Sequence, residues 1–162
     1  MTVKSNYHLL INYIRGMSKV LEEEWQSNAK DIGLTLAEQH VMWIVNSKEK
    51  ISVTDIAKIG LWDRSTVMQI IKRLQEKDLI YMTKNKKDLR VTFIALTKEG
   101  KAKRDESQQK TYKFFEFIED YQKNNKEFME EFLRFYREFN RHFHGEEFVE
   151  WVEETTKNYK DL

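Results

Sequence analysis

The chain has no cysteine, no proline and only five glycines among its 162 residues. Without cysteine it forms no disulfide, offers no thiol nucleophile and supplies no thiolate metal ligand. Because proline interrupts helices and glycine weakens them, their scarcity favours long helices. The sequence also lacks an apolar run long enough to cross a bilayer and the charged-then-apolar order of a signal peptide. We therefore expect a cytoplasmic protein with no membrane partner.

Signatures of catalysis are missing as well. The sequence contains no phosphate-binding glycine loop, no nucleophile elbow and no HExxH motif. Its four histidines are scattered and form no evident acid–base pair. His142, His144, Glu146 and Glu147 do cluster, but their spacing is neither the helical metal pair nor a finger pattern. We expect a protein that is not an enzyme and needs no metal or other cofactor.

The net charge of +1 hides a segregation of charge along the chain. Residues 58–104 contain thirteen basic and five acidic side chains, whereas residues 105–162 contain nine and fifteen. A basic block is typical of proteins that contact nucleic-acid phosphates, and an acidic tail should point away from DNA. A scaffold that binds only other proteins is the alternative, but it would not require this basic surplus.

Residues 52–77 predict two short helices joined by a turn. Ser52 is expected to cap the first helix, and Gly60 to end it in the left-handed conformation. Leu61 and Trp62 would span the turn, and Asp63 would cap a second helix over about residues 64–77. Four apolar residues of the second helix recur at helical spacing and should face the core: Val67, Ile70, Ile71 and Leu74.

A hairpin is expected next, with strands near residues 79–83 and 90–96 and a lysine-rich tip between them. Helix, turn, helix and hairpin in this order indicate a winged helix-turn-helix, whose second helix enters the major groove of DNA. The polar side chains on the outer face of that helix and on the wing can contact bases or phosphates. The candidate DNA-binding residues are Arg64, Ser65, Thr66, Gln69, Lys72, Arg73, Lys84, Lys86, Lys87 and Arg90.

Helices are expected on both sides of this unit. Residues 7–28 show a wide apolar face at helical spacing, Thr35 and Glu38 form a capping box, and Thr97 is expected to cap a long helix. Fourteen of the 21 aromatic residues follow Arg104, including a stripe of phenylalanines from Phe128 to Phe143. A homodimer built from the first and last helices would bury this surface, and an internally packed helical subdomain is the alternative.

Several motifs resemble the MarR family of dimeric winged-helix transcriptional regulators. They are Ile56-Ala57-Lys58, Ser65-Thr66-Val67, the Asp88-Leu89-Arg90 wing element and Leu96-Thr97-Lys98-Glu99-Gly100. The segments Glu38–Ile44 and Arg141–Phe148, with the position of Gly60, are similar to the Hpr (ScoC) subgroup. The resemblance implies one mainly α domain over residues 1–162, with a winged unit at 35–97 and helical dimerisation regions at 1–34 and 98–162.

The resemblance also implies roles for single residues. Arg90 would reach the minor groove, oriented by an ion pair with Asp88, while the second helix reads the major groove. Gln69 favours adenine, so we expect a homodimeric repressor on an A/T-rich inverted repeat. Many members of the family bind a small phenolic or anionic effector, and His40, Trp43 and Trp62 could line such a cleft here. Structural roles in the core are the alternative for these three residues.

Overall fold

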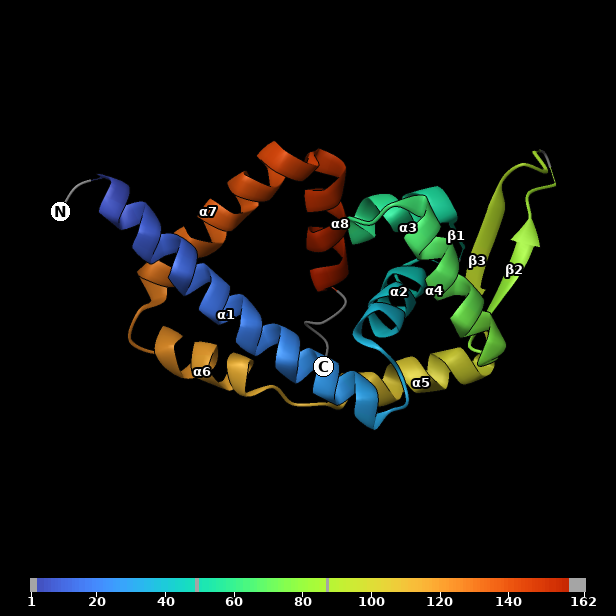
Figure 1. Ribbon diagram of the computed structural model, residues 1–162, viewed down its shortest axis with the longest axis horizontal. Helices are drawn as coiled ribbons and strands as arrows, with labels where there is room; N and C mark the ends of the chain where they lie inside the picture. Colours follow the sequence, from blue (N-terminus) through green and yellow to red (C-terminus); the bar gives the residue numbers. More distant parts are fainter. Residues whose placement is uncertain (1–2, 49, 87, 158–162) are drawn as a thin grey trace.

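The computed structural model describes residues 3–48, 50–86 and 88–157. The chain is mainly helical and carries one small antiparallel sheet with the strand order β1-β3-β2 (Figure 1). The predicted fold class is therefore confirmed. In chain order the elements are α1 (Val3–Asp31), α2 (Leu36–Asn46), β1 (Ile51–Ser52), α3 (Val53–Gly60), α4 (Arg64–Glu76), β2 (Ile80–Lys84), β3 (Thr92–Leu96), α5 (Lys98–Gln108), α6 (Lys113–Gln122), α7 (Lys126–His144) and α8 (Glu146–Lys157).

The hydrophobic core lies where α2, α3, α4 and the sheet meet the end of α1. The four apolar residues of α4 that were predicted to face the core are each at most 1% exposed. The hairpin forms as expected, with Ile80 opposite Leu96 and Lys84 opposite Thr92. The two-residue strand β1, which sequence patterns did not indicate, pairs with β3 on the other edge. Most of the core thus lies in the winged unit, and the end of α1 completes it.

The predicted helix starts are confirmed by their hydrogen bonds. Thr35 and Glu38 form the full capping box at α2. The side chains of Ser52, Asp63 and Thr97 accept from the backbone N–H groups three residues later, at the starts of α3, α4 and α5. Each of these caps satisfies a donor that a helix end would otherwise leave without a partner.

The role predicted for Gly60 is wrong. Gly60 is the last residue of α3, and Leu61 takes the left-handed conformation instead, with φ of 57°. A Cβ atom at Gly60 would lie 2.4 Å from Cε3 of Trp62, far inside van der Waals contact. The glycine therefore allows the Trp62 ring to pack against α3, and the turn itself does not need it.

The long helix expected after Thr97 is also wrong, because α5 ends at Gln108 and α6 begins only at Lys113. Side chains of α1 bind the backbone near this break. The amide of Asn28 donates to the carbonyl of Thr111 at 3.1 Å, and Glu24 accepts from the N–H of Phe114 at 2.9 Å. Through these bonds, backbone groups near the break find hydrogen-bond partners on α1. The local sequence pattern does not reveal such distant partners.

The C-terminal helices return to the winged unit, where α8 lies beside α3 (Figure 1). Trp151 Nε1 donates to Ser47 Oγ at 2.9 Å, at the end of α2, and Lys58 of α3 pairs with Glu147. None of the helices in the described ranges is long and apolar enough to cross a membrane.

The carboxylate of Glu38 joins two helices of the core. The side chain is 1% exposed, and its Oε2 accepts from the N–H of Thr35 and from Lys77 Nζ, both at 2.8 Å. Arg73 Nε lies 3.5 Å from the same carboxylate. Because Glu38 belongs to α2 whereas Arg73 and Lys77 lie at the C-terminal end of α4, this carboxylate links the two helices.

We expect Glu38→Gln to destabilise the protein in a pH-dependent way. Burial raises the pKa of Glu38, but the bonds from Lys77 and Thr35 and the charges of Lys77 and Arg73 outweigh it, so the pKa lies below its ordinary value. A carboxyl with a lowered folded-state pKa stabilises the fold above its ordinary pKa, and this stability is lost as the pH falls through the folded-state value. The loss at pH 7 should be about 2 kcal/mol.

Urea unfolding at pH 7 and at pH 3 measures this effect, and the difference between variant and wild type should shrink at the lower pH. Glu76→Gln is the matched control, because Glu76 is exposed and pairs only loosely with Lys72, at 4.0 Å. An equal loss at both pH values would show that the charge of Glu38 is not what stabilises the fold.

Candidate nucleic-acid interface

The outward face of α4 carries polar side chains close to the start of the helix. Ser65, Gln69 and Lys72 are exposed, whereas Thr66 is half-buried. Asp63 accepts from the hydroxyls of Ser65 and Thr66, and these bonds hold the pKa of Asp63 well below its usual range. The two hydroxyl oxygens keep lone pairs and remain available as acceptors. The first turn of α4 is thus held rigidly while its outer face stays open.

Arg73 differs from the other candidates on α4. Its guanidinium faces the buried Glu38 at 3.5 Å and therefore lies on the side of α4 that meets α2. Helical spacing alone placed Arg73 on the open face, because the pattern of α4 does not show which neighbouring helix carries a buried acid. Arg73 thus pairs with Glu38 while its side chain stays 48% exposed, and its contact with DNA remains a prediction.

The wing carries the remaining basic candidates. Arg90 has a side chain that is 92% exposed, and its Nε lies 3.1 Å from Asp88 Oδ1, which also accepts from the Arg90 backbone N–H. The ion pair implied by the resemblance is therefore present, and the bond from Arg90 lowers the pKa of Asp88. Lys84 Nζ donates to Thr92 Oγ1, and Lys86 is exposed. Lys87 lies outside the described residues.

The wing and α4 meet at a common hollow of ≈ 290 Å³. Arg64 at the start of α4 and Arg90 on the wing both line it, together with Ser52 and Thr54 from the start of α3. Sequence patterns did not single out Ser52 and Thr54 as site residues, although their place at a helix start next to a basic helix was a usable signal. Three segments therefore converge on one basic surface.

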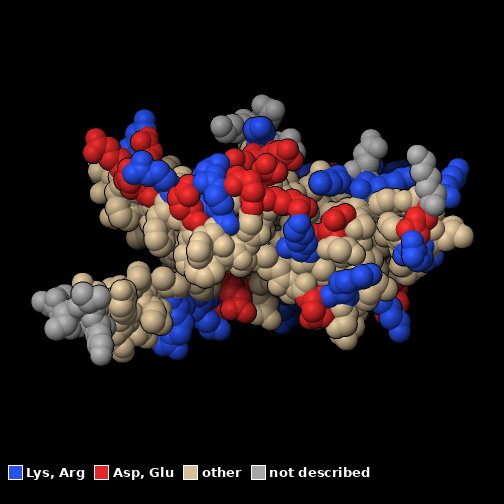
Figure 2. Space-filling model, turned by 90° about the horizontal axis from the view of Figure 1, so that it is seen from above, with Lys and Arg blue, Asp and Glu red and all other residues tan. Residues whose placement is uncertain are grey.

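Charge is segregated in space as it is along the chain. Figure 2 shows Lys and Arg side chains predominating over the end of the molecule that carries the wing, whereas Asp and Glu gather elsewhere on this face among further Lys and Arg side chains. Such a surface attracts a polyanion to the winged end and repels it from the C-terminal helices.

The residues considered for an effector cleft are packed against one another. The ring centroids of His40 and Trp62 lie 5.1 Å apart. The ring of Trp25 lies between those of His40 and Trp43, with centroid distances of 5.3 Å and 5.1 Å. Trp43 Nε1 donates to Ser107 Oγ at 3.0 Å. At these distances the rings contact one another, so the three candidate residues form one aromatic cluster with Trp25, and their role in binding an effector stays a prediction.

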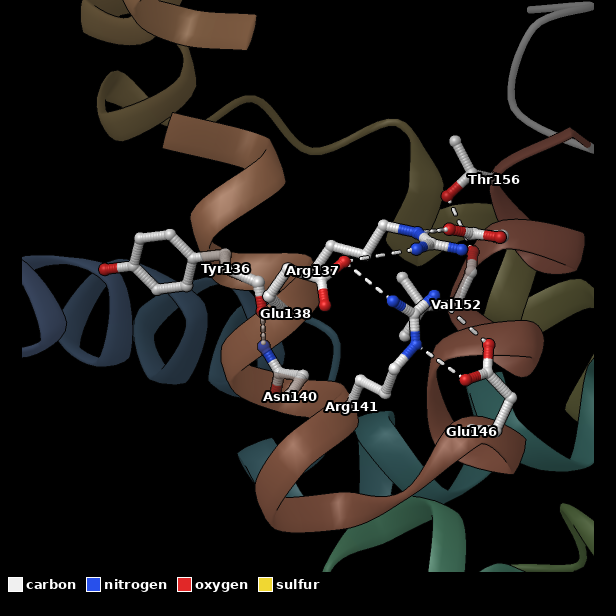
Figure 3. Close-up of polar contacts among 9 residues, drawn as sticks. Tyr136, Arg137, Glu138, Asn140, Arg141, Glu146, Val152 and Thr156 are labelled. Atoms are coloured by element: carbon white, nitrogen blue, oxygen red, sulfur yellow. Dashed lines mark hydrogen bonds and ion pairs between the residues drawn. The ribbon is translucent and has the colours of Figure 1, made fainter. Parts of the chain in front are cut away.

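The histidines and acids considered for a metal site have other partners. Arg141 Nε lies 2.6 Å from Glu146 and Arg141 Nη1 lies 2.6 Å from Glu138 (Figure 3). Glu147 pairs with Lys58. The ring of His142 lies against Phe143, and that of His144 against Phe148. No group of metal-binding side chains occurs among the described residues.

The fold and its open basic face define a winged helix-turn-helix protein. The model of the SarA/Rot family of transcriptional regulators matches residues 24–107, and the chain belongs to this family. The match spans α2 to α5, which includes the whole winged unit.

Curated relatives are regulators of the same kind. The chain is 30% identical over 95 residues to the HTH-type transcriptional regulator Hpr of Exiguobacterium sibiricum. The aligned residues cover 59% of this chain and 50% of that protein. It is 33% identical over 86 residues to the DNA-binding transcriptional repressor ScoC of Bacillus subtilis. Here the aligned residues cover 53% of this chain and 42% of that protein. The chain thus spans about half the length of the curated relatives it matches, and the similarity to the Hpr subgroup is confirmed.

Solved structures show the same fold. A mutant MarR from E. coli complexed with operator DNA has a TM-score of 0.61 at 17% identity, covering 67% of this chain and 78% of that one. The YusO protein from Bacillus subtilis has a TM-score of 0.55 at 20% identity, covering 83% and 95%. The MarR-type architecture is therefore confirmed, and at these identities the likeness concerns the fold alone.

We expect the aromatic cluster to make stability depend on pH above the range in which Glu38 titrates. Burial lowers the pKa of His40. Below about pH 6.5 this histidine is therefore protonated more readily in the unfolded chain than in the folded protein. Stability should therefore fall as the pH drops from 7.5 to 5.5. In His40→Phe, which keeps a packed ring without a titrating group, that decline should largely vanish in urea unfolding.

The matched control is His8→Gln on the exposed part of α1, which should retain the wild-type decline. A decline of the same size in the wild-type protein and in His40→Phe would assign the effect to other groups.

Proposed function

We propose that this protein is a sequence-specific DNA-binding transcriptional regulator of the repressor type. The observation that carries the proposal is the pairing of an open polar face on α4 with the exposed Arg90 of the wing at one hollow. A face of this kind fits the major groove, while a wing arginine fits the adjacent backbone or minor groove. The name of the relative ScoC supports the repressor assignment.

A regulator of this kind acts on the chromosome, so we propose a cytoplasmic location.

Each contact has a chemical role in this proposal. Gln69 presents an amide that can pair with the donor and acceptor of adenine in the major groove, so the operator would be rich in A·T pairs. Ser65 and Thr66 can bond to bases or phosphates, and Arg64, Lys72, Lys84, Lys86 and Lys87 would hold phosphates. Asp88 would keep Arg90 extended from the wing tip through their ion pair.

We expect Arg90→Ala to weaken binding to a selected operator duplex about tenfold or more. It should also lower the steepness of the plot of log K against log salt concentration by about one. Arg134→Ala on α7 is the matched control, because Arg134 pairs with Glu131 away from the winged unit and should leave affinity unchanged. Fluorescence anisotropy across a salt series measures both quantities. If selected and shuffled duplexes bind equally at physiological salt, the protein is not sequence-specific.

The regulator would act as a homodimer. The apolar stripe of α7 remains exposed, with Phe128, Phe135, Phe139 and Phe143 each at least 46% accessible. Large apolar side chains on α1 and α6 are exposed as well, among them Tyr13 and Phe117. A contiguous apolar surface of this kind marks a protein interface, and a two-fold dimer engages two half-sites of an inverted repeat.

Sedimentation equilibrium at micromolar concentration should give twice the mass of the chain. Phe139→Glu introduces a charge into the stripe and should shift the protein toward the monomer and weaken operator binding. Asn124→Glu adds the same charge at the exposed turn before α7 and should do neither. A single-chain mass for the wild-type protein would contradict the dimer and favour an internally packed helical subdomain.

A further inference from the structure

One large apolar side chain stands on the open face of α4. Met68 is 43% exposed, and the other exposed positions of this helix are polar or charged. They are Arg64, Ser65, Gln69, Lys72, Arg73, Gln75 and Glu76. A single exposed apolar residue is ordinary on a protein surface. Its place among the side chains proposed to meet DNA is what gives Met68 significance.

Helix geometry and the surface hollows both place Met68 within that contact surface. Met68 follows Ser65 by three residues and precedes Lys72 by four, so the three side chains share one ridge of α4. Met68 lines the hollow that contains Arg64 and Arg90, and it also lines a second hollow of ≈ 360 Å³ with Gln69 and Lys72. Its thioether therefore lies at the junction of the reading helix and the wing.

The chemistry of the major groove offers one apolar partner for such a side chain. Every A·T pair presents the 5-methyl group of thymine there, and no other base carries an apolar group in an unmodified duplex. Methionine is unbranched and polarizable, so it adapts to a small apolar contact. Gln69, its neighbour in the chain, carries the amide suited to adenine, so the two residues would favour the same kind of base pair.

We propose that Met68 contacts a thymine 5-methyl group and is a specificity-determining residue of the interface. This inference rests on the proposed function and extends it, because it names a readout of A·T pairs that uses no hydrogen bond. Removing the methyl group from the contacted thymine should weaken binding about fourfold, as expected for the transfer of one buried methyl group.

The test replaces each thymine of a selected operator by deoxyuridine, one position at a time, which deletes the methyl group and leaves base pairing intact. The wild-type protein should lose affinity about fourfold at one or two positions of each half-site. Met68→Ala should bind the unsubstituted operator about as weakly as wild type binds the uracil duplex, and it should no longer distinguish thymine from uracil at those positions. Met68→Leu keeps an apolar side chain and should restore the discrimination.

Gln75→Ala is the matched control, because Gln75 lines the same second hollow without an apolar end and should keep full sensitivity to uracil. If Met68→Ala weakens binding but retains the uracil effect, Met68 only supports the packing between α4 and the wing, and the inference is overturned. If the wild-type protein binds the operator specifically but ignores every uracil, the inference also fails while the proposed function stands. If specific binding is absent altogether, the proposed function itself is wrong.

Discussion

The buried carboxylate of Glu38 is the interaction on which the geometry of the winged unit depends. It closes the capping box of α2 through Thr35 and binds Lys77 and Arg73 at the far end of α4. Because a charge inside a protein is costly unless its partners are in place, this arrangement strongly disfavours other positions of α4 relative to α2. The end of α4 is held by this group, and its beginning is left open toward the wing.

That division explains how one helix serves both packing and recognition. The apolar stripe of α4 packs in the core and the exposed Arg73 reaches back to Glu38, whereas Ser65, Met68, Gln69 and Lys72 face outward beside the wing. The acidic α8 is held away from this face by its contacts with α3 and the end of α2. A nearly neutral chain therefore presents a surface rich in Lys and Arg over its winged end (Figure 2), while much of its acidic charge lies on the C-terminal helices.

Features that depend on neighbours in the sequence were predicted well. The caps at Thr35, Ser52, Asp63 and Thr97 are formed by residues three positions apart, and the core side of α4 follows from helical periodicity. The hairpin shifted by no more than two residues at its strand ends, and the Asp88–Arg90 ion pair that the family resemblance implied joins residues two positions apart. In each case the determining contact is short-range, so the pattern of residue types contains it.

The class of fold, the order of the elements and the basic segment follow from the amino-acid sequence alone, because caps, periodicity and charge are properties of nearby residues. Four features depend on packing in three dimensions: Gly60 makes room for Trp62, Arg73 pairs with Glu38, the helical run ends after α5 where α1 offers partners, and His40 packs between Trp25 and Trp62. Each of these depends on side chains distant in the chain, or on how the turn folds back over the helix. Their positions are set by packing, which no local spacing records.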